Sequence, residues 1–217
     1  MTGSVEPVLM GILSFLLPAA GWLFTKGTIY QAKKGTDYRH QLARLKNNGD
    51  VFAAMIRHQP AVARDLGDMG IQIGNPKAKN TLIKVCNPYC GPCAKAHPKI
   101  EKLIDENENW RVQIIFTASG DDEDQKTAPA ALMLAIAIQN DETKTRKALD
   151  DWYNAEEKDY EQFAARYPMN SELTQQKKKL KTMDTWCKEV GITHTPTFFV
   201  NGHELPTQYE IEDLKYL

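Results

Sequence analysis

A strand-like run that leads directly into clustered cysteines restricts the fold of this chain more than any other feature. Residues 81–86, Thr-Leu-Ile-Lys-Val-Cys, form a β-rich run of strand length. Helical periodicity follows from about Cys90 to Glu106, and a second strand-like run, Trp-Arg-Val-Gln-Ile-Ile-Phe-Thr, begins at Trp110. The sequence therefore predicts an α/β fold built around a βαβ unit, with cysteines at the junction between its first strand and its helix.

The motif Cys90-Gly91-Pro92-Cys93 places two thiols one helical turn apart at the start of the predicted helix. Only Cys90 can lie where unpaired backbone N–H groups point outward, and these donors and the helix dipole favour a thiolate. We therefore expect Cys90 to have a depressed pKa and to act as the nucleophile. Cys93 can then attack the mixed disulfide and release the product. Pro92 suits an early helical position, where its missing N–H costs nothing.

A metal site is the alternative interpretation of the same segment. Cys86, Cys90, Cys93 and His97 bring four soft ligands close together in the sequence. Zinc sites usually pair two such clusters or add a distant ligand pair, which this chain lacks. Convergence of ligands from a strand and a helix would also require distortion. We therefore expect no metal ion and predict that His97 is a surface or packing histidine. A copper- or metal-delivery protein is the less favoured alternative.

An uncharged, apolar segment near the N-terminus has the length of a membrane-spanning helix, which needs about 20 apolar residues. A buried helix or a secretory signal is the alternative, but no Lys or Arg precedes the segment, as it would in a signal peptide. We therefore predict a transmembrane helix over residues 1–27 and a helical linker over residues 28–68. Basic residues follow the segment, and for a lone anchor they would place the rest of the chain in the cytoplasm.

The remaining residues, 69–217, are predicted to form one domain. Residues 126–190 have the pattern of consecutive helices and are predicted to be a helical insertion. A strand at Thr197–Val200, a turn at Asn201-Gly202 and a closing helix over Gln208–Leu217 complete the prediction. The chain carries 27 basic and 28 acidic residues, a net charge of −1, so no electrostatic field would gather a polyanion. We expect no nucleic-acid partner.

The order of these elements resembles the thioredoxin fold over roughly residues 70–217. Pro98 falls where thioredoxins carry their helix-kinking proline, and Thr195-Pro196 looks like the family's cis-proline loop. The long helical insertion is similar to that of periplasmic DsbA-like oxidoreductases. The resemblance implies a protein thiol–disulfide oxidoreductase that acts on protein thiols and disulfides. It implies catalysis by Cys90 and Cys93, with substrate contacts from Tyr89, Gly91, Pro92, Thr195 and Pro196.

A membrane segment ahead of a DsbA-like domain resembles the C-terminal part of bacterial fusions of vitamin K epoxide reductase with thioredoxin. That resemblance implies a bacterial inner-membrane protein with its thioredoxin-like domain in the periplasm, which would remove the topology conflict. Electrons would pass from substrate thiols to a membrane partner domain like vitamin K epoxide reductase, and to a quinone only through it. No cofactor is expected in this chain. Oxidation of substrate thiols is the favoured direction, with a reductase or isomerase as the alternative.

The chain departs from the thioredoxin pattern at Lys84. Thioredoxins place a buried carboxylate at this position, six residues before the first active cysteine, and it accepts the proton of the second thiol. A lysine near the pair favours a thiolate by its charge but cannot replace that carboxylate as a base. The proton path of the reaction is therefore left open.

Three further residues are auxiliary candidates. Cys86 and Cys187 lie in apolar segments, where packing is the default role of a free cysteine. A disulfide between them, or a transient relay from Cys86 to Cys90, is the alternative. His194 stands two residues before Pro196 and is expected near the rim of the active site. A substrate contact or a loop role is favoured over direct catalysis.

Overall fold

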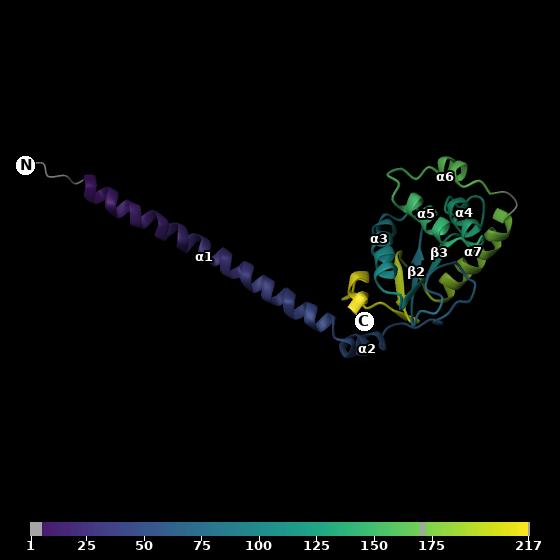
Figure 1. The fold of residues 1–217 in the computed structure, drawn as a ribbon, viewed down its shortest axis with the longest axis horizontal. Helices are drawn as coiled ribbons and strands as arrows, with labels where there is room; N and C mark the ends of the chain where they lie inside the picture. Colours follow the sequence, from purple (N-terminus) through teal and green to yellow (C-terminus); the bar gives the residue numbers. More distant parts are fainter. Residues whose placement is uncertain (1–5, 170–171, 217) are drawn as a thin grey trace, which may run out of the picture. The chain divides into compact units, whose positions relative to one another are not determined.

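The computed structural model describes residues 6–169 and 172–216, and the chain divides into two compact units, residues 1–48 and 49–217. In the first unit, α1 (Glu6–Lys46) is one continuous helix of 41 residues (Figure 1). The described part of the segment predicted to cross a membrane and the first part of the predicted linker therefore belong to one helix, with no break at residue 27. Residues 49–68 of the predicted linker belong to the second unit.

The predicted membrane span falls partly outside the described residues. Where backbone and side chains are described, no helix combines the length and the apolar character that crossing a bilayer requires. The predicted span also contains residues 1–5 and seven side chains that the structure does not describe, at positions 6–9, 12, 13 and 15. The membrane span therefore stays a prediction.

The second unit is built on a five-stranded mixed sheet with the strand order β1-β3-β2-β4-β5 (Figure 1). Strands β2 and β3 are parallel, and the other neighbouring pairs are antiparallel. The predicted βαβ unit is confirmed, because β2 leads into α3 and then into β3. The strands are β1 (Ile71–Gly74), β2 (Asn80–Cys86), β3 (Trp110–Phe116), β4 (Thr197–Val200) and β5 (His203–Glu204).

Helices cover both faces of this sheet, with α3 on one side and α7 on the other (Figure 1). Strand β2 lies between them, and all its residues from Thr81 to Cys86 are buried, which explains their nearly continuous apolar run. The helices of this unit are α2 (Gly49–Ile56), α3 (Gly91–Glu106), α4 (Thr127–Ala137), α5 (Glu142–Tyr153), α6 (Tyr160–Arg166), α7 (Glu172–Glu189) and the short 3₁₀ helix η1 (Ile211–Tyr216).

The predicted insertion contains α4, α5, α6 and α7 in its described part. Helix α6 was not predicted as a separate element, because seven residues are too few for a clear apolar period. Its sequence signal was the capping residue Asp159, whose carboxylate accepts a hydrogen bond from the N–H of Gln162 at 3.1 Å.

Two other predicted helices are shorter than expected. The helical pattern around Pro60 ends at Ile56, and the N–H of Val62 instead donates to the carbonyl of Gly202 at 2.7 Å. The closing helix is the 3₁₀ helix η1, and residue 217 lies outside the described residues. The hairpin turn agrees with the prediction, since Asn201 and Gly202 have φ angles of 52° and 89°.

Candidate active site

The Cys90 thiol lies at the N-terminal end of α3, as the motif predicted. Cys90 is the N-cap residue, with an extended backbone (φ −78°, ψ 115°), and its sulfur accepts a hydrogen bond from the N–H of Cys93 at 3.3 Å. The thiol also donates to the carbonyl oxygen of Thr195 at 3.3 Å. The sulfur therefore lies between a helix N-terminus and the loop before β4, and it is partly exposed.

The loop that delivers Cys90 is held by its own polar groups and by helix α5. The side-chain oxygen of Asn87 accepts the N–H of Tyr89 at 2.9 Å. The indole N–H of Trp152, on α5, donates to the carbonyl of Pro88 at 2.8 Å. The Tyr89 and Trp152 rings meet edge to face with centroids 5.5 Å apart. The helical insertion thus supports the active-site loop, which the sequence analysis did not anticipate.

The loop before β4 forms the other wall of the site. Its Thr195–Pro196 peptide bond is cis, as the resemblance implied. The hydroxyl of Thr197 donates to the carbonyl of His194 at 2.7 Å and so ties the loop to the first residue of β4. His194 is exposed on this loop, and its expected place at the rim of the active site stays a prediction. Gly91 and Pro92 are also exposed, on the first turn of α3.

The pKa of the Cys90 thiol is lowered, although partial burial acts in the opposite direction. Burial alone would raise this pKa, but side-chain hydrogen bonds with Thr195 and Cys93, the backbone N–H of Cys93 and the positive charge of Lys84 stabilise the thiolate and outweigh it. A thiolate at a partly exposed position can attack a disulfide, and a sulfur in that position can itself be attacked.

Cys93 and Cys86 lie in the opposite environment, because both are fully buried. Burial, the neighbouring Cys86 and the hydrogen bond with Cys90 raise the pKa of the Cys93 thiol. Burial also raises the pKa of Cys86, whose sulfur accepts a hydrogen bond from the Tyr153 hydroxyl at 3.1 Å. Cys86 therefore has a polar partner, beyond the purely apolar packing that its sequence context suggested.

Lys84 is fully buried behind the cysteine pair. Its ammonium group donates to the carbonyl oxygen of Cys93 at 3.3 Å and lies 4.3 Å from the centre of the Tyr153 ring. A buried lysine with one carbonyl partner and an aromatic face is an uncommon arrangement. The contact of Lys84 with Tyr153 was not identified from the sequence, because it joins residues that are 69 positions apart.

The remaining candidates occupy different surroundings. Cys187 is buried on α7, and burial raises its pKa to about 12. All four cysteines are free thiols, so no Cys86–Cys187 bond is formed here. His97 is fully buried, which removes the surface alternative, and its Nε2 lies 2.9 Å from Oδ1 of Asp150. Among the described residues, no group of three or more His, Cys, Asp or Glu side chains could hold a metal ion.

Comparison with known families now identifies the domain. A sequence model of the thioredoxin family matches residues 67–217, which is more than half of the chain. The chain belongs to the thioredoxin family. The predicted α/β thioredoxin fold is therefore confirmed, and the chain is a thiol–disulfide oxidoreductase of that family. No curated protein sequence matches the chain.

Solved structures with the same fold include bacterial redox proteins. Proteus mirabilis ScsC, in a transitional conformation, is 13% identical with a TM-score of 0.59, and the match covers 96% of this chain and 94% of that one. A periplasmic thioredoxin-like protein from Salmonella enterica serovar Typhimurium is 14% identical with a TM-score of 0.57, over 70% and 92% of the two chains. Oxidised BdbD from Bacillus subtilis is 13% identical with a TM-score of 0.55, over 72% and 94%. At these identities the likeness concerns the fold.

Proposed function

We propose that this thioredoxin-family enzyme oxidises protein thiols in the bacterial periplasm through a reversible disulfide between Cys90 and Cys93. The observation that carries the proposal is the contrast between the two sulfurs. The Cys90 sulfur is partly exposed at a helix N-terminus, whereas the Cys93 thiol is fully buried one turn further along the same helix. A substrate sulfur can therefore reach Cys90 and cannot reach Cys93.

The exchange proceeds in two balanced steps. A substrate thiolate attacks the Cys90 sulfur of the oxidised enzyme, which forms a mixed disulfide and displaces the Cys93 sulfur with its electron pair. A second substrate thiolate then attacks the substrate sulfur of the mixed disulfide, which forms the substrate disulfide and releases Cys90 as a thiolate. The substrate loses two electrons and the enzyme gains them. In the reverse direction Cys93 resolves the mixed disulfide.

The lowered pKa of Cys90 supports oxidation as the direction. Every interaction that stabilises the Cys90 thiolate stabilises the reduced enzyme, and a more stable reduced form makes the disulfide a stronger oxidant. A reductase or isomerase is the alternative. Titration against glutathione buffers separates them, because a potential near that of DsbA, about −120 mV, supports oxidation and one near that of thioredoxin, about −270 mV, contradicts it.

Substrate binding is proposed at the rim formed by two loops. The backbone of Thr195 beside Pro196 offers an edge to which an extended peptide can add as a strand. Tyr89, Gly91 and Pro92 border Cys90 on the opposite side, and the last two are exposed. Because such pairing uses backbone groups, it accepts many sequences around a substrate cysteine.

The cellular setting of the proposal combines the periplasm with a membrane tether. The Salmonella relative is described as periplasmic, which supports this compartment. The apolar segment before Lys26 supports a tether in the inner membrane, next to a partner domain like vitamin K epoxide reductase that passes electrons to a quinone. Carbonate extraction of bacterial membranes tests the tether. Recovery of the whole chain in the extracted supernatant would contradict it, and with it the membrane partner.

Trapping of substrates tests the assigned roles directly. A Cys93→Ser variant should accumulate mixed disulfides with periplasmic proteins, because the resolving thiol is missing, whereas Cys90→Ser should accumulate none. Both variants have the same number of cysteines, so each is the matched control of the other. Equal trapping by the two variants would contradict the assignment of Cys90 as the exchanging residue.

A further inference from the structure

A buried histidine lies one helical turn behind Cys93. Cys93 and His97 are four residues apart on α3, so their side chains lie on the same face of the helix. Nε2 of His97 lies 2.9 Å from Oδ1 of Asp150 on α5. The other ring nitrogen, Nδ1, is buried and has no hydrogen-bond partner among the described residues. With the Nε2 proton donated to Asp150, Nδ1 is an unoccupied acceptor.

The other polar groups behind Cys93 are already engaged. The ammonium group of Lys84 donates to the Cys93 carbonyl and faces the Tyr153 ring. The Tyr153 hydroxyl donates to Cys86, and its ring lies 5.3 Å from that of His97. A protonated amine accepts no further proton, and burial keeps the Tyr153 hydroxyl protonated by raising its pKa. Glu101, one turn further along α3, also faces the histidine, with its Oε1 3.9 Å from Nε2 and its other oxygen paired with Arg146. His97 is the neutral base nearest to Cys93 along this helix face.

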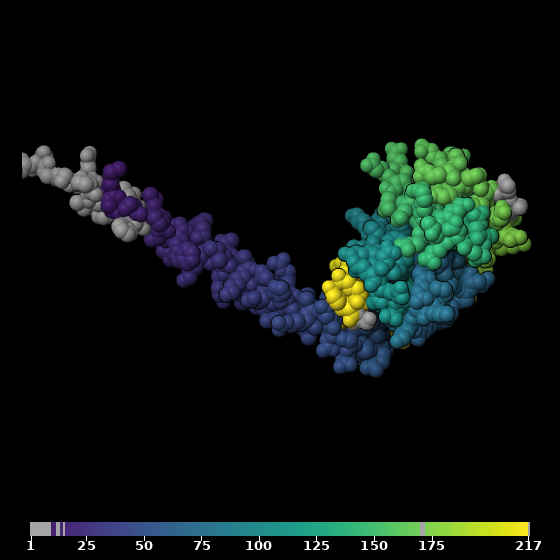
Figure 2. Space-filling view, viewed as in Figure 1, coloured from purple at the N-terminus to yellow at the C-terminus, as the bar shows by residue number. Residues whose placement is uncertain are grey.

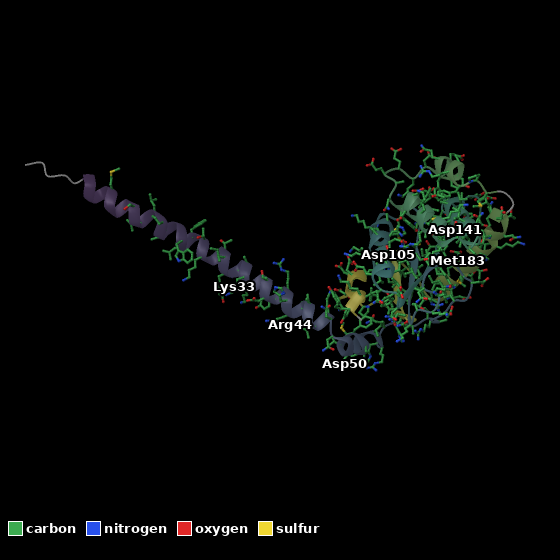
Figure 3. The ribbon with its side chains drawn as sticks, viewed as in Figure 1. Lys33, Arg44, Asp50, Asp105, Asp141 and Met183 are labelled. Carbon is green, nitrogen blue, oxygen red and sulfur yellow. The ribbon has the colours of Figure 1, made fainter. Side chains whose placement is uncertain are left out.

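Asp150 connects the histidine to solvent. Its side chain is 48% exposed, whereas that of His97 is fully buried. Asp150 lines a surface groove of 620 Å³ between α3 and α5. Arg146 crosses the groove and pairs with Glu101 and Asp105, the latter at 2.7 Å. Figure 2 shows the surfaces of these two helices adjoining, and Figure 3 labels Asp105 on α3.

We propose that His97 carries the proton of the Cys93 thiol to the surface: Nδ1 accepts it while Nε2 passes its own proton to Asp150. The proposal deepens the proposed function and rests on the resolving role of Cys93. It supplies a proton path in a chain where Lys84 occupies the position of the usual carboxylate.

The step balances without a further reactant. As Cys93 attacks the mixed disulfide, a bond forms between the Cys90 and Cys93 sulfurs and the bond from Cys90 to the substrate sulfur breaks. The substrate leaves as a thiolate with the electron pair of that bond. The Cys93 proton moves to His97, and the proton delivered to Asp150 passes to water in the groove. In the oxidising direction the same path returns a proton to Cys93.

The electrostatics of the histidine suit a relay. Burial and the charge of Lys84 lower the pKa of His97 to about 4, although Asp150 acts in the opposite direction. The ring is therefore neutral at the pH of the periplasm and free to accept. A ring with so low a pKa does not retain the proton, which is why transfer to Asp150 accompanies acceptance.

The test follows the two thiols separately with an aromatic disulfide that releases a coloured nitrothiophenolate. The reduced protein releases one equivalent when Cys90 attacks and a second when Cys93 resolves the mixed disulfide. His97→Gln should leave the first phase unchanged and slow the second roughly 100-fold at neutral pH, the scale of general-base catalysis. The loss should shrink as the pH rises, because hydroxide replaces the base. The exposed His58→Gln serves as the matched control.

Each outcome decides between the two proposals. A missing first phase in the unaltered protein contradicts the proposed function itself. If His97→Gln shows a normal first phase and an unchanged second phase, only the proton path is contradicted. A slow second phase in Lys84→Met, together with a normal second phase in His97→Gln, contradicts it as well. If His97→Gln fails to fold, the unaltered protein decides. Its second phase should be slower in heavy water, and equal rates in the two solvents would overturn the relay.

Discussion

Two sites three residues apart at the start of α3 place a cysteine thiol in opposite environments. At the edge of α3, the Cys90 sulfur meets backbone donors and solvent, and its pKa is lowered. One turn further in, the Cys93 thiol is fully buried beside Cys86, and its pKa is raised. The difference teaches that sequence spacing alone does not make a cysteine reactive. The helix end and access to water decide it.

The largest expected effect follows from removing the Cys90 thiol at the N-terminal end of α3. Cys90→Ser should lower the rate of thiol exchange by more than about 1,000-fold, because a serine hydroxyl does not form a thiolate or a disulfide. Circular dichroism should show an unchanged fold, since the residue is partly exposed. The measurement is oxidation of a dithiol peptide by the pre-oxidised protein. Retained turnover would show that another thiol performs the exchange.

The second prediction concerns stability in the interior region. The pKa of His97 falls from 6.5 in the unfolded chain to about 4 in the folded one, so the unfolded chain binds more protons between these values. The folded protein should lose up to about 3 kcal/mol of stability as the pH falls from 6.5 to 4. Urea unfolding across this range should show a flatter profile for His97→Gln than for His58→Gln. Parallel profiles would contradict a neutral buried His97.

The third prediction uses the opposite signs of the two thiols in the reduced protein. The lowered pKa of Cys90 contributes stability that is present above the ordinary thiol value of 9.0 and is lost as the pH falls through the lowered pKa. The raised pKa of Cys93 contributes stability that is present below 9.0 and is lost as the pH rises above it.

The free energy of unfolding of the reduced protein should therefore rise towards pH 9.0 and fall beyond it, by at most about 1.4 kcal/mol per pH unit for each thiol. Cys90→Ser should remove the rise and keep the fall. A rise that survives this substitution would assign it to a group other than Cys90.

The smallest expected effect tests how Trp152 supports the loop that carries Cys90. Trp152→Phe removes the hydrogen bond to the Pro88 carbonyl and leaves most of the aromatic packing in place. We expect a loss of about 1 to 2 kcal/mol in unfolding free energy, because that buried carbonyl loses its partner. Faster alkylation of Cys90 would show that the loop has loosened. Unchanged alkylation and stability would mean that the insertion does not hold the loop.

Local patterns in the sequence were enough to predict the strand, the helix and the strand around the cysteines. The spacing of Cys90 and Cys93 predicted their places at the N-cap and one turn inside, and Asn201-Gly202 predicted the hairpin. Short elements were less predictable, as α6 and η1 show, because few residues carry a weak period. The exact extent of the segment around Pro60 depended on pairing with the distant strand β5.

By itself, the sequence determined the cysteine motif, the family to which the domain belongs, and which thiol can lie at the helix end. These follow from local propensity and short-range spacing. Only the tertiary structure decided that Lys84, His97 and Tyr153 share one buried cluster, and that Trp152 supports the active-site loop. The physical reason is that burial and hydrogen-bond partners arise when distant segments pack together. The pKa of each group depends on that packing, so a residue's identity alone does not set it.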